Sequence, residues 1–597
     1  MTETSVIASN TAPLELGSSR TGILTPARER VLLLACYAVL LVLTSTTMQG
    51  DTVYYAHSIV ERSNGTGSTF WEFGHMLWRP LGYLAVTIVS LVDRPLSQPE
   101  LLRRTLVTLM GLVVVFGALA IVAFHTVVGS VLRSRAAVLL ATLTFMLAHA
   151  FLNYVHTGAA YVPALAMLVL CLAQLLRHSG GSDLVAGILA GLALAASVLF
   201  WAPMIFAAPT PILALIFLRD RSRRTLILGL STTLVSVAVA GAATLIFAAA
   251  AGVRSIGQLL AWVSSSSHGI AGTGGFARMV LGFGRSLMDV EQLGLLTKRF
   301  LLHDAYNTVK LTDLVRSGMA ELVLVYLLLA VLLLPLARSA WGRRVLGFLA
   351  AACLPVLVFA LRWQGGDLER YLGLFPALFL AVGVGIDSLW QRAPSDIETV
   401  ATSRRPDARV PGWRLLVGAA LGCAFAIFNI PPLVRGRVVA QCDRIGHRIE
   451  AIPLHQGSEA LAFTPYYLDE PAAYEASCPV AAARVLQGRQ VVGLVMPGVN
   501  SASDWQTGFR QQVDSAWRRG VSVWLSETAL DPRPPRESKW AEGERKDVQW
   551  AAFPSFFSQF ELRRLTTGAE VARGGFLEIP PTALNRSIVA GNHESSR

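Results

Sequence analysis

The first residues that could do chemistry are acids beside the first long apolar run. Asp51 stands in the stretch TTMQGDTVYYAHSIVE, residues 46–61, directly after that run. A carboxylate placed there can act as a general base toward a hydroxyl group, or it can be no more than a polar end to a helix. Glu72 is a second candidate acid, because the turn sequence RSNGTGST could fold it back toward Asp51; the alternative is a solvated loop glutamate. His75 could hydrogen-bond to such an acid or to a substrate oxygen, or be an ordinary interface residue.

Three arginines beside apolar runs form a second group of candidates. Arg79, Arg362 and Arg370 all lie in segments predicted to be extracytoplasmic, where arginine is normally depleted. The guanidinium presents a planar fork of donors that matches a phosphate group. The neighbouring acids Asp367 and Glu369 could instead form simple ion pairs with these arginines. The sequence therefore offers both a base and phosphate-binding cations.

The elements that must position these residues are membrane helices. Of 597 residues, 53% are apolar and only 15% are charged, and the mean hydropathy is +0.51. Apolar runs long enough to cross a hydrocarbon layer of about 30 Å lie near 30–48, 105–128, 136–154, 158–176, 184–200, 203–218, 225–250, 320–337, 345–361, 371–388 and 414–431. The sequence thus predicts an α-helical polytopic membrane protein with about eleven transmembrane helices.

The arginines also set the predicted orientation, because they collect in every second loop. They cluster near 20–30, 133–135, 177, 219–224, 338–344 and 392–409. The tail 1–28 is then cytoplasmic and disordered, and the first apolar run is an uncleaved anchor. The stretch 80–93 has only about 14 residues and is predicted to lie in the interface. Residues 29–431 form the membrane module of a cell-membrane protein, with Asp51 facing outward.

Besides the short outer turns, three longer segments are predicted to be extracytoplasmic. The first is 49–103, and the second, 251–319, is either a mobile lid or a cover over the bundle, with helical pieces around 276–288 and 292–302. The third, 432–597, has a sharply different composition. Its strand-like stretches 460–468, 491–498 and 521–527, and its helix-like stretch 504–520, predict a soluble α/β domain. Its predicted role is structural or acceptor-binding.

The cysteines divide between the two predicted modules. Four lie in apolar runs and are simple small hydrophobes: Cys36, Cys171, Cys353 and Cys423. Cys442 and Cys478 lie in the extracytoplasmic region, where an oxidising compartment would permit a disulfide. Spacing alone leaves their pairing open.

Read as a whole, the first loop resembles the GT-C superfamily of integral-membrane glycosyltransferases, which includes protein O-mannosyltransferases and lipid A aminoarabinose transferases. A Gly-Asp outside the first helix, a nearby tyrosine, and a later histidine before a proline, glycine and tyrosine carry the resemblance. These residues are Gly50, Asp51, Tyr55, His75, Pro80, Gly82 and Tyr83. Arg370 and Tyr371, before a proline-containing helix, resemble a second family feature. The chain departs from the family pattern in having a lone Asp51 and HMLWRPLGY instead of His-Pro-Pro-Gly-Tyr.

The resemblance implies transfer of a sugar from a polyprenyl-phosphate donor to an extracytoplasmic glycan, lipid or protein acceptor. Asp51 and Glu72 are then the catalytic candidates, and the substrate-binding candidates are Tyr55, His75, Arg79, Arg362, Arg370 and Tyr371. A lipid-linked sugar must react at the outer interface, and a single carboxylate suits direct displacement with inversion. The sequence shows no metal-ligand spacing and leaves any cofactor open.

Two other classes of protein remain as alternatives. A transporter or flippase of lipid-linked precursors would predict internal repeats and charges at midmembrane, and neither is found in the sequence. A non-catalytic assembly protein would use the same scaffold without chemistry at Asp51. The net charge of +12 reflects the arginines that set topology and does not indicate a nucleic-acid partner.

Overall fold

The structure is a computed structural model of the 597-residue chain. It describes residues 25–47, 51–63, 70–91, 97–178, 182–219, 222–265, 275–290, 296–297, 300, 309–387, 412–454, 459–466, 470–495, 505–530, 552–564 and 575–591.

All eleven predicted apolar runs are helical. They correspond to α1 (Pro26–Leu43), α4 (Gln98–Val131), α5 (Arg135–Leu147) with α6 (His149–Tyr154), α7 (Tyr161–Arg177), α8 (Asp183–Phe200), η2 (Ala202–Phe206) with α9 (Pro209–Leu218), α10 (Arg223–Ala250), α15 (Ala320–Leu333), α16 (Ala340–Arg362), α17 (Phe375–Ile386) and α19 (Gly412–Asn429). Within the described residues, seven spans are long and apolar enough to cross a membrane, and three further apolar helices are shorter. The predicted fold class is confirmed.

Local sequence explains where several of these helices begin. Four helices start at a serine whose hydroxyl accepts a hydrogen bond from the backbone N–H three residues later: Ser134 for α5, Ser182 for α8, Ser222 for α10 and Ser339 for α16. Each such cap contributes about 1 kcal/mol. All four caps stand in or beside the arginine-containing turns of the chain, so the helices and the charges that orient them are specified by the same short stretches.

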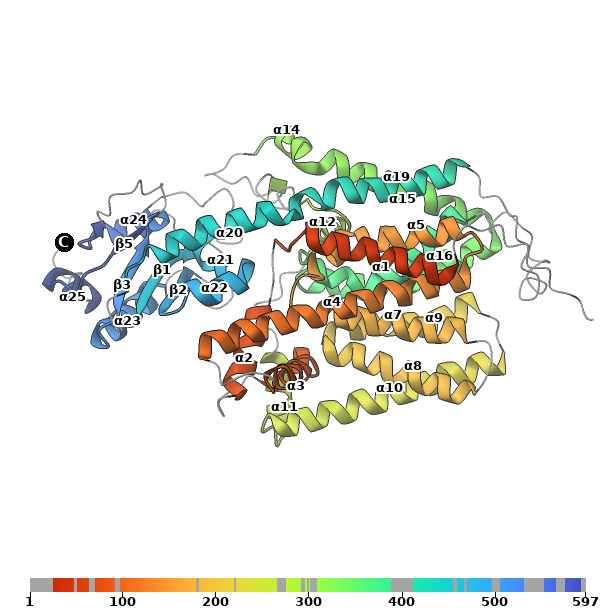
Figure 1. The fold of residues 1–597 in the computed structure, drawn as a ribbon, viewed down its shortest axis with the longest axis horizontal. Coiled ribbons are helices and arrows are strands. Elements are labelled where there is room, and N and C mark those ends of the chain that lie inside the picture. The colour runs from red at the N-terminus through yellow and green to blue at the C-terminus, as the bar shows by residue number, and fades with distance from the viewer. Residues whose placement is uncertain are drawn as a thin grey trace, which may run out of the picture.

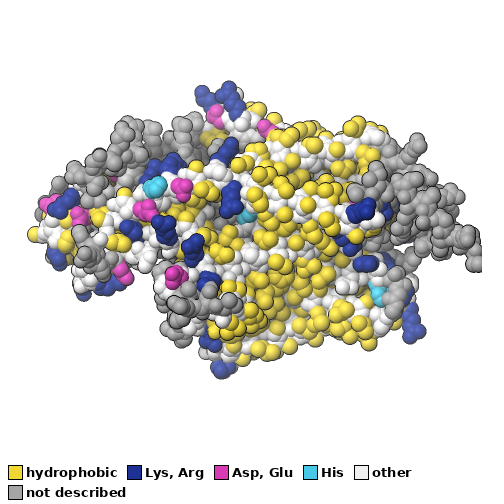
Figure 2. All heavy atoms as spheres, viewed as in Figure 1, with side chains coloured by type: hydrophobic (Ala, Val, Ile, Leu, Met, Phe, Trp, Pro, Cys, Tyr) yellow, Lys and Arg dark blue, Asp and Glu magenta, His cyan; other side chains and the backbone are white. Residues whose placement is uncertain are grey.

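The long helices run side by side across Figure 1, and the C-terminal domain extends from one end of the bundle. Figure 2 shows a broad hydrophobic face over the bundle, whereas acidic and basic side chains gather over and beside the C-terminal domain. This distribution is that of a membrane-embedded body with a water-exposed domain.

The predicted orientation can be tested by cysteine labelling at exposed serines. Ser63, at the end of α2 (Thr52–Ser63), and Ser555, in α24 (Ala552–Phe557), are exposed on the predicted outer side. We expect Ser63→Cys and Ser555→Cys to react with a membrane-impermeant maleimide in intact cells. Ser222→Cys, at an arginine-rich turn, should react only after permeabilisation. Protection of residue 63 in intact cells would reverse the orientation.

A crosswise layer lies at the end of the bundle that carries Asp51. It contains α2, η1 (Phe73–His75), α3 (Trp78–Ser90) and α11 (Ile256–Ser265). In Figure 1 α3 is seen nearly along its axis while the long helices run across the view. Large apolar side chains on α3 are exposed: Leu84, Ile88 and Val89. An exposed apolar face on a short crosswise helix agrees with an interfacial position, and that position of 80–93 stays a prediction.

The second predicted external segment is only partly described. The expected helical piece at 276–288 is present as α12 (Phe276–Leu287). Most of the piece at 292–302 and most of the stretch 264–275 lie outside the described residues. After this segment the chain returns through α14 (Leu311–Leu314), η3 (Val315–Met319) and α15, and η4 (Leu334–Arg338) follows before α16.

The region after 432 contains the predicted sheet. After η8 (Pro431–Leu433), α20 (Arg435–Glu450) leads to β1 (Ala460–Tyr466), α21 (Glu470–Ser477), α22 (Pro479–Val485), β2 (Arg489–Val495), α23 (Trp505–Arg518), β3 (Ser522–Ser526), η9 (Glu527–Leu530), α24, β4 (Arg563–Arg564), β5 (Phe576–Glu578) and α25 (Ala583–Val589). The strand order is β2-β1-β3-β5-β4, with β1 parallel to both β2 and β3. The three predicted strands and the helix between two of them are therefore confirmed.

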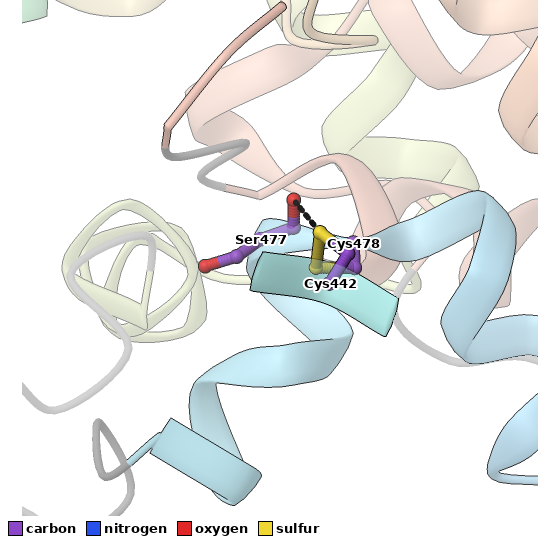
Figure 3. Close-up of a disulfide and its surroundings, with 3 residues drawn as sticks. All are labelled: Cys442, Ser477 and Cys478. Carbon is purple, nitrogen blue, oxygen red and sulfur yellow. Dashed lines mark hydrogen bonds between the residues drawn. A yellow bond between two sulfur atoms is a disulfide. The ribbon is translucent and has the colours of Figure 1, made fainter. Parts of the chain in front are cut away.

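The C-terminal domain contains an internal disulfide and makes a polar contact with α2. Cys442 of α20 and Cys478 at the start of α22 form a disulfide with a Cα–Cα distance of 5.8 Å, which settles the pairing that the spacing left open (Figure 3). The dashed line in that figure joins Cys442 Sγ to the Ser477 carbonyl oxygen at 4.0 Å. A disulfide sulfur carries no proton, so this is a contact and not a hydrogen bond. Nearby, His57 of α2 lies 3.0 Å from the Glu475 carboxylate of α21.

The pair of His57 and Glu475 makes this docking depend on pH. The hydrogen bond to Glu475 raises the pKa of His57 above its usual value. Because the folded-state pKa is the higher one, the added stability is present below about pH 6.5 and is lost as pH rises through the folded value. Both side chains are about half exposed, so the effect is well under about 1 kcal/mol. We expect His57→Gln to lower the melting temperature slightly near about pH 6 and not at all near about pH 9.

The matched control for this prediction is His447→Gln, which alters an exposed histidine paired within α20. It should change melting less, because that pair does not connect α2 to the C-terminal domain. An equal loss at both pH values for His57→Gln would contradict the charge-pair interpretation.

Candidate functional site

Asp51 is held at the beginning of α2 by two tyrosines. The Tyr161 hydroxyl donates to Asp51 Oδ2 at 2.9 Å, and the Tyr55 hydroxyl donates to the same oxygen at 3.2 Å. Within the described part of the chain, no hydrogen bond reaches the other oxygen, Oδ1. The side chain is partly exposed. The carboxylate is thus fixed through one oxygen and presents the second.

The environment of Tyr55 keeps its hydroxyl a proton donor. Its side chain is fully buried. Burial, followed by the nearby carboxylates of Asp51 and Glu72, raises the pKa of Tyr55 well above its usual value, and Arg79 opposes this only in part. The hydroxyl therefore stays protonated and can donate to Asp51.

A short polar segment between two apolar runs braces the Asp51 loop. The amide oxygen of Asn153 accepts hydrogen bonds from the Thr46 hydroxyl at 2.9 Å and from the Thr47 backbone N–H at 3.3 Å. His156 Nε2 lies 2.9 Å from the Thr44 hydroxyl. Together with Tyr154 and Tyr161, these residues make NYVHTGAAY, residues 153–161, the centre of the site.

None of these four residues was predicted from the sequence to belong to the site. The available signal was the polar composition of NYVHTG, which interrupts two apolar runs at the outer end of the bundle. Buried polar side chains need partners, and here the partners are the backbone and side chains of the loop that leads to Asp51.

The second half of the site comes from η5 (Leu368–Leu374), at the start of a late helix of the bundle. Glu369 is buried, and its Oε2 accepts a hydrogen bond from the Tyr154 hydroxyl at 2.6 Å. Its other oxygen lies 3.8 Å from Arg370 Nε. The Tyr154 and Tyr161 rings meet edge to face, with centroids 4.9 Å apart. Through these two rings the structure connects Glu369 and Arg370 to Asp51.

Arg370 is a mostly buried cation that packs against aromatic rings, with 13% of its side chain exposed. Its guanidinium carbon lies 5.7 Å from the ring centroids of both Trp201 and Phe359. One terminal nitrogen donates to Gln364 Oε1, while Nε is buried and has no hydrogen-bond partner in the described structure. Besides the adjacent acids, the Asp51 carboxylate acts on it electrostatically. A charged donor of this kind is suited to a phosphate.

The structure places Glu72 and Arg79 against each other. Their side chains form a buried ion pair, and the guanidinium of Arg79 lies over the rings of Tyr54 and Tyr55, 4.7 and 5.3 Å from their centroids. Glu72 and Asp51 both lie close enough to Tyr55 to act on its hydroxyl electrostatically, and a role for Glu72 as a second acid stays a prediction. The Glu72–Arg79 pair also packs against Tyr55, one of the two donors to Asp51.

Of the remaining predicted residues, His75 contacts the two tyrosines beside Asp51, whereas Tyr371 holds neighbouring backbone segments together. His75 is buried with its ring 4.9 Å from that of Tyr55 and 6.4 Å from that of Tyr161. The Tyr371 hydroxyl donates to the Met279 and Gly365 carbonyl oxygens, so it fixes α12 to the turn before η5.

Arg362 ends α16 with an exposed side chain and contacts none of the other candidates in the described structure. In the same described residues, no group of three or more His, Cys, Asp or Glu side chains could hold a metal ion.

Comparison with known proteins identifies the fold. No protein-family model and no curated protein matches the sequence. The structure of ArnT from Cupriavidus metallidurans bound to undecaprenyl phosphate is similar over 93% of this chain and 98% of ArnT, with a TM-score of 0.50 and 12% identity. The oligosaccharyltransferase of Archaeoglobus fulgidus is similar over 94% of this chain and 78% of its own, with a TM-score of 0.46 and 15% identity. Arabinofuranosyltransferase AftD from Mycobacteria is similar over 93% of this chain and 40% of its own, with a TM-score of 0.44 and 16% identity.

The likeness to ArnT extends along nearly the whole of both chains. It shows that this chain has the GT-C fold of integral-membrane glycosyltransferases. The resemblance seen in the first loop and in the Arg370–Tyr371 pair is thereby confirmed at the level of the fold.

Proposed function

We propose that this chain is a GT-C glycosyltransferase of the cell membrane that transfers a sugar from a polyprenyl-phosphate donor to an extracytoplasmic acceptor. Asp51 is the general base and Arg370 binds the donor phosphate. The observation that carries this proposal is that a carboxylate with one oxygen to which no described residue donates, and a mostly buried arginine, belong to one connected cluster at the end of the bundle.

The chemistry follows from the two ends of this cluster. The acceptor hydroxyl gives its proton to Asp51 Oδ1 while its oxygen attacks the anomeric carbon of the donor sugar. The bond from that carbon to the phosphate oxygen breaks, and polyprenyl phosphate leaves with the electron pair. Arg370 stabilises the charge that grows on the leaving phosphate. One displacement at one carbon inverts the anomeric configuration.

The surroundings support each role. Tyr55 and Tyr161 both use Asp51 Oδ2, which leaves Oδ1 for the acceptor. The crosswise helix α3 places apolar side chains beside the site, where a lipid-linked donor must approach from the bilayer. ArnT, whose fold this chain shares, has undecaprenyl phosphate bound in its structure. The Glu72–Arg79 pair and His75 support Tyr55 in this proposal, and neither Arg362 nor Tyr371 has a catalytic role.

The proposal is tested by supplying donors directly. Purified protein in nanodiscs should be incubated with a panel of polyprenyl-phosphate sugars, each radiolabelled in the sugar, together with membrane extract as the source of acceptor. We expect release of polyprenyl phosphate with at least one donor, accompanied by label in the acceptor fraction. Transport of intact donor across a proteoliposome membrane without release of polyprenyl phosphate would instead establish the flippase alternative.

A further inference from the structure

Glu369 is a buried carboxylate that has no role in the chemistry proposed above. Its side chain is almost completely enclosed, yet it carries a hydrogen bond of 2.6 Å from the Tyr154 hydroxyl and an ion pair with Arg370 Nε at 3.8 Å. Burying a carboxylate costs several kcal/mol unless its partners compensate. Stability alone gives no reason for an acid at this position, because an apolar residue there would avoid the cost.

The position of Glu369 constrains the fork of Arg370. Glu369 lies on the Nε side of the guanidinium, and Gln364 accepts from one terminal nitrogen, which also lies 3.8 Å from the half-exposed Asp367 carboxylate. With Trp201 and Phe359 against the group, the plane of the fork has little freedom. A guanidinium fixed in this way loses less side-chain conformational entropy when it binds a phosphate.

Through Tyr154, the Glu369 carboxylate is also connected to the half of the site that contains Asp51. It holds the hydroxyl of Tyr154, and the Tyr154 ring packs edge to face on the ring of Tyr161, whose hydroxyl donates to Asp51. The chain of contacts from Arg370 to Asp51 therefore runs through Glu369, Tyr154 and Tyr161 without a gap. These residues come from three separate parts of the sequence.

We propose that Glu369 is a positioning residue, which fixes Arg370 and, through Tyr154 and Tyr161, sets its placement relative to Asp51. This inference rests on the proposed function and adds a residue to it. Glu369 touches neither the reacting carbon nor the transferred proton. It acts on the reaction by aligning the phosphate-binding fork with the leaving oxygen while the base is aligned with the acceptor.

The test is a double-mutant cycle with Arg370. Glu369→Gln keeps an oxygen that can accept from Tyr154 but removes the charge that orients Arg370. We expect kcat to fall roughly tenfold, with the donor KM within about twofold of wild type, because the charge that attracts the phosphate remains and only its alignment is lost. In an Arg370→Lys background the same change should cost less than about twofold, because a residue that acts through Arg370 has nothing left to align.

Tyr154→Phe gives a second route to the same result. It leaves every charge in place, so it tests the positioning chain even if Glu369→Gln fails to fold, and it should also lower kcat with little effect on donor KM. Tyr37→Phe is the matched control, since Tyr37 is a buried tyrosine whose hydroxyl donates only to the Val114 carbonyl oxygen. Thermal melting in detergent would verify that each variant is folded.

Two outcomes would overturn the inference. One is that Glu369→Gln and Tyr154→Phe retain the kinetics of Tyr37→Phe. The other is that their losses multiply fully with that of Arg370→Lys, which is the behaviour of residues that only stabilise the fold. Both are distinguishable from failure of the proposed function, in which wild-type protein releases no polyprenyl phosphate from any donor or Asp51→Asn remains fully active.

Discussion

Asp51→Asn is expected to lower the rate of sugar transfer by roughly 10²-fold or more. The amide keeps the size of the side chain, and its oxygen can still accept hydrogen bonds from Tyr55 and Tyr161. It cannot take a proton from the acceptor, so the attacking oxygen must lose its proton without a base. The loss should appear in kcat and not in donor KM, because Arg370 and its surroundings are unchanged.

The measurement is donor-dependent release of polyprenyl phosphate in nanodiscs at matched amounts of protein. Asp514→Asn is the control, since Asp514 pairs with Arg518 on an exposed face of α23 in the C-terminal domain. It should retain wild-type turnover. Full activity of Asp51→Asn with a normal melting temperature would remove Asp51 from the chemistry and leave the GT-C fold without its proposed base.

Arg370→Lys should have the second largest effect, a loss of roughly ten- to a hundredfold. Lysine keeps one positive charge but lacks the planar fork, so a two-point contact with the phosphate is lost. If Arg370 also stabilises charge that grows on the leaving phosphate, kcat should fall by more than donor KM rises. Arg370→Ala should be worse, because it also leaves the buried Glu369 carboxylate without its cation.

Arg362→Lys provides the comparison for this prediction. Arg362 lies at the end of α16, close to Arg370 in sequence, but its side chain is exposed and takes no part in the cluster. Its replacement should change the kinetics less than about twofold, as for other surface charges. If the Arg370 variants are unaffected and Arg362→Lys loses activity, the phosphate site has been assigned to the wrong arginine.

Much of the architecture was predictable because it depends on neighbours in the sequence. Runs of about 20 apolar residues specify the helices, and arginines in alternate turns indicate their direction. In the C-terminal domain, short apolar stretches between turns specified β1, β2 and β3. Asp51 and Arg370 also stood out locally, one as an acid at a helix end and the other as a cation in a loop that should lack them.

The partners of these two residues were decided only by the tertiary structure. Tyr161 is 110 residues from Asp51 in sequence, and Tyr154 is 215 residues from Glu369. Nothing in the local pattern of a tyrosine beside an apolar run distinguishes one that donates to a buried or half-buried carboxylate from one that faces lipid. The same holds for Glu72 and Arg79, which the sequence offered as separate functional groups and the fold joined as a buried pair.

Sequence by itself therefore determined the helices of this protein and the strands of its C-terminal domain, and it indicated Asp51 and Arg370 as the two groups of the proposed reaction. The tertiary structure decided how those groups are connected, through Glu369, Tyr154 and Tyr161. The physical reason lies in the range of the interactions. Burial of an apolar run and capping of a helix are satisfied within a few residues, whereas a buried carboxylate or hydroxyl finds its partner only when packing brings distant helices together.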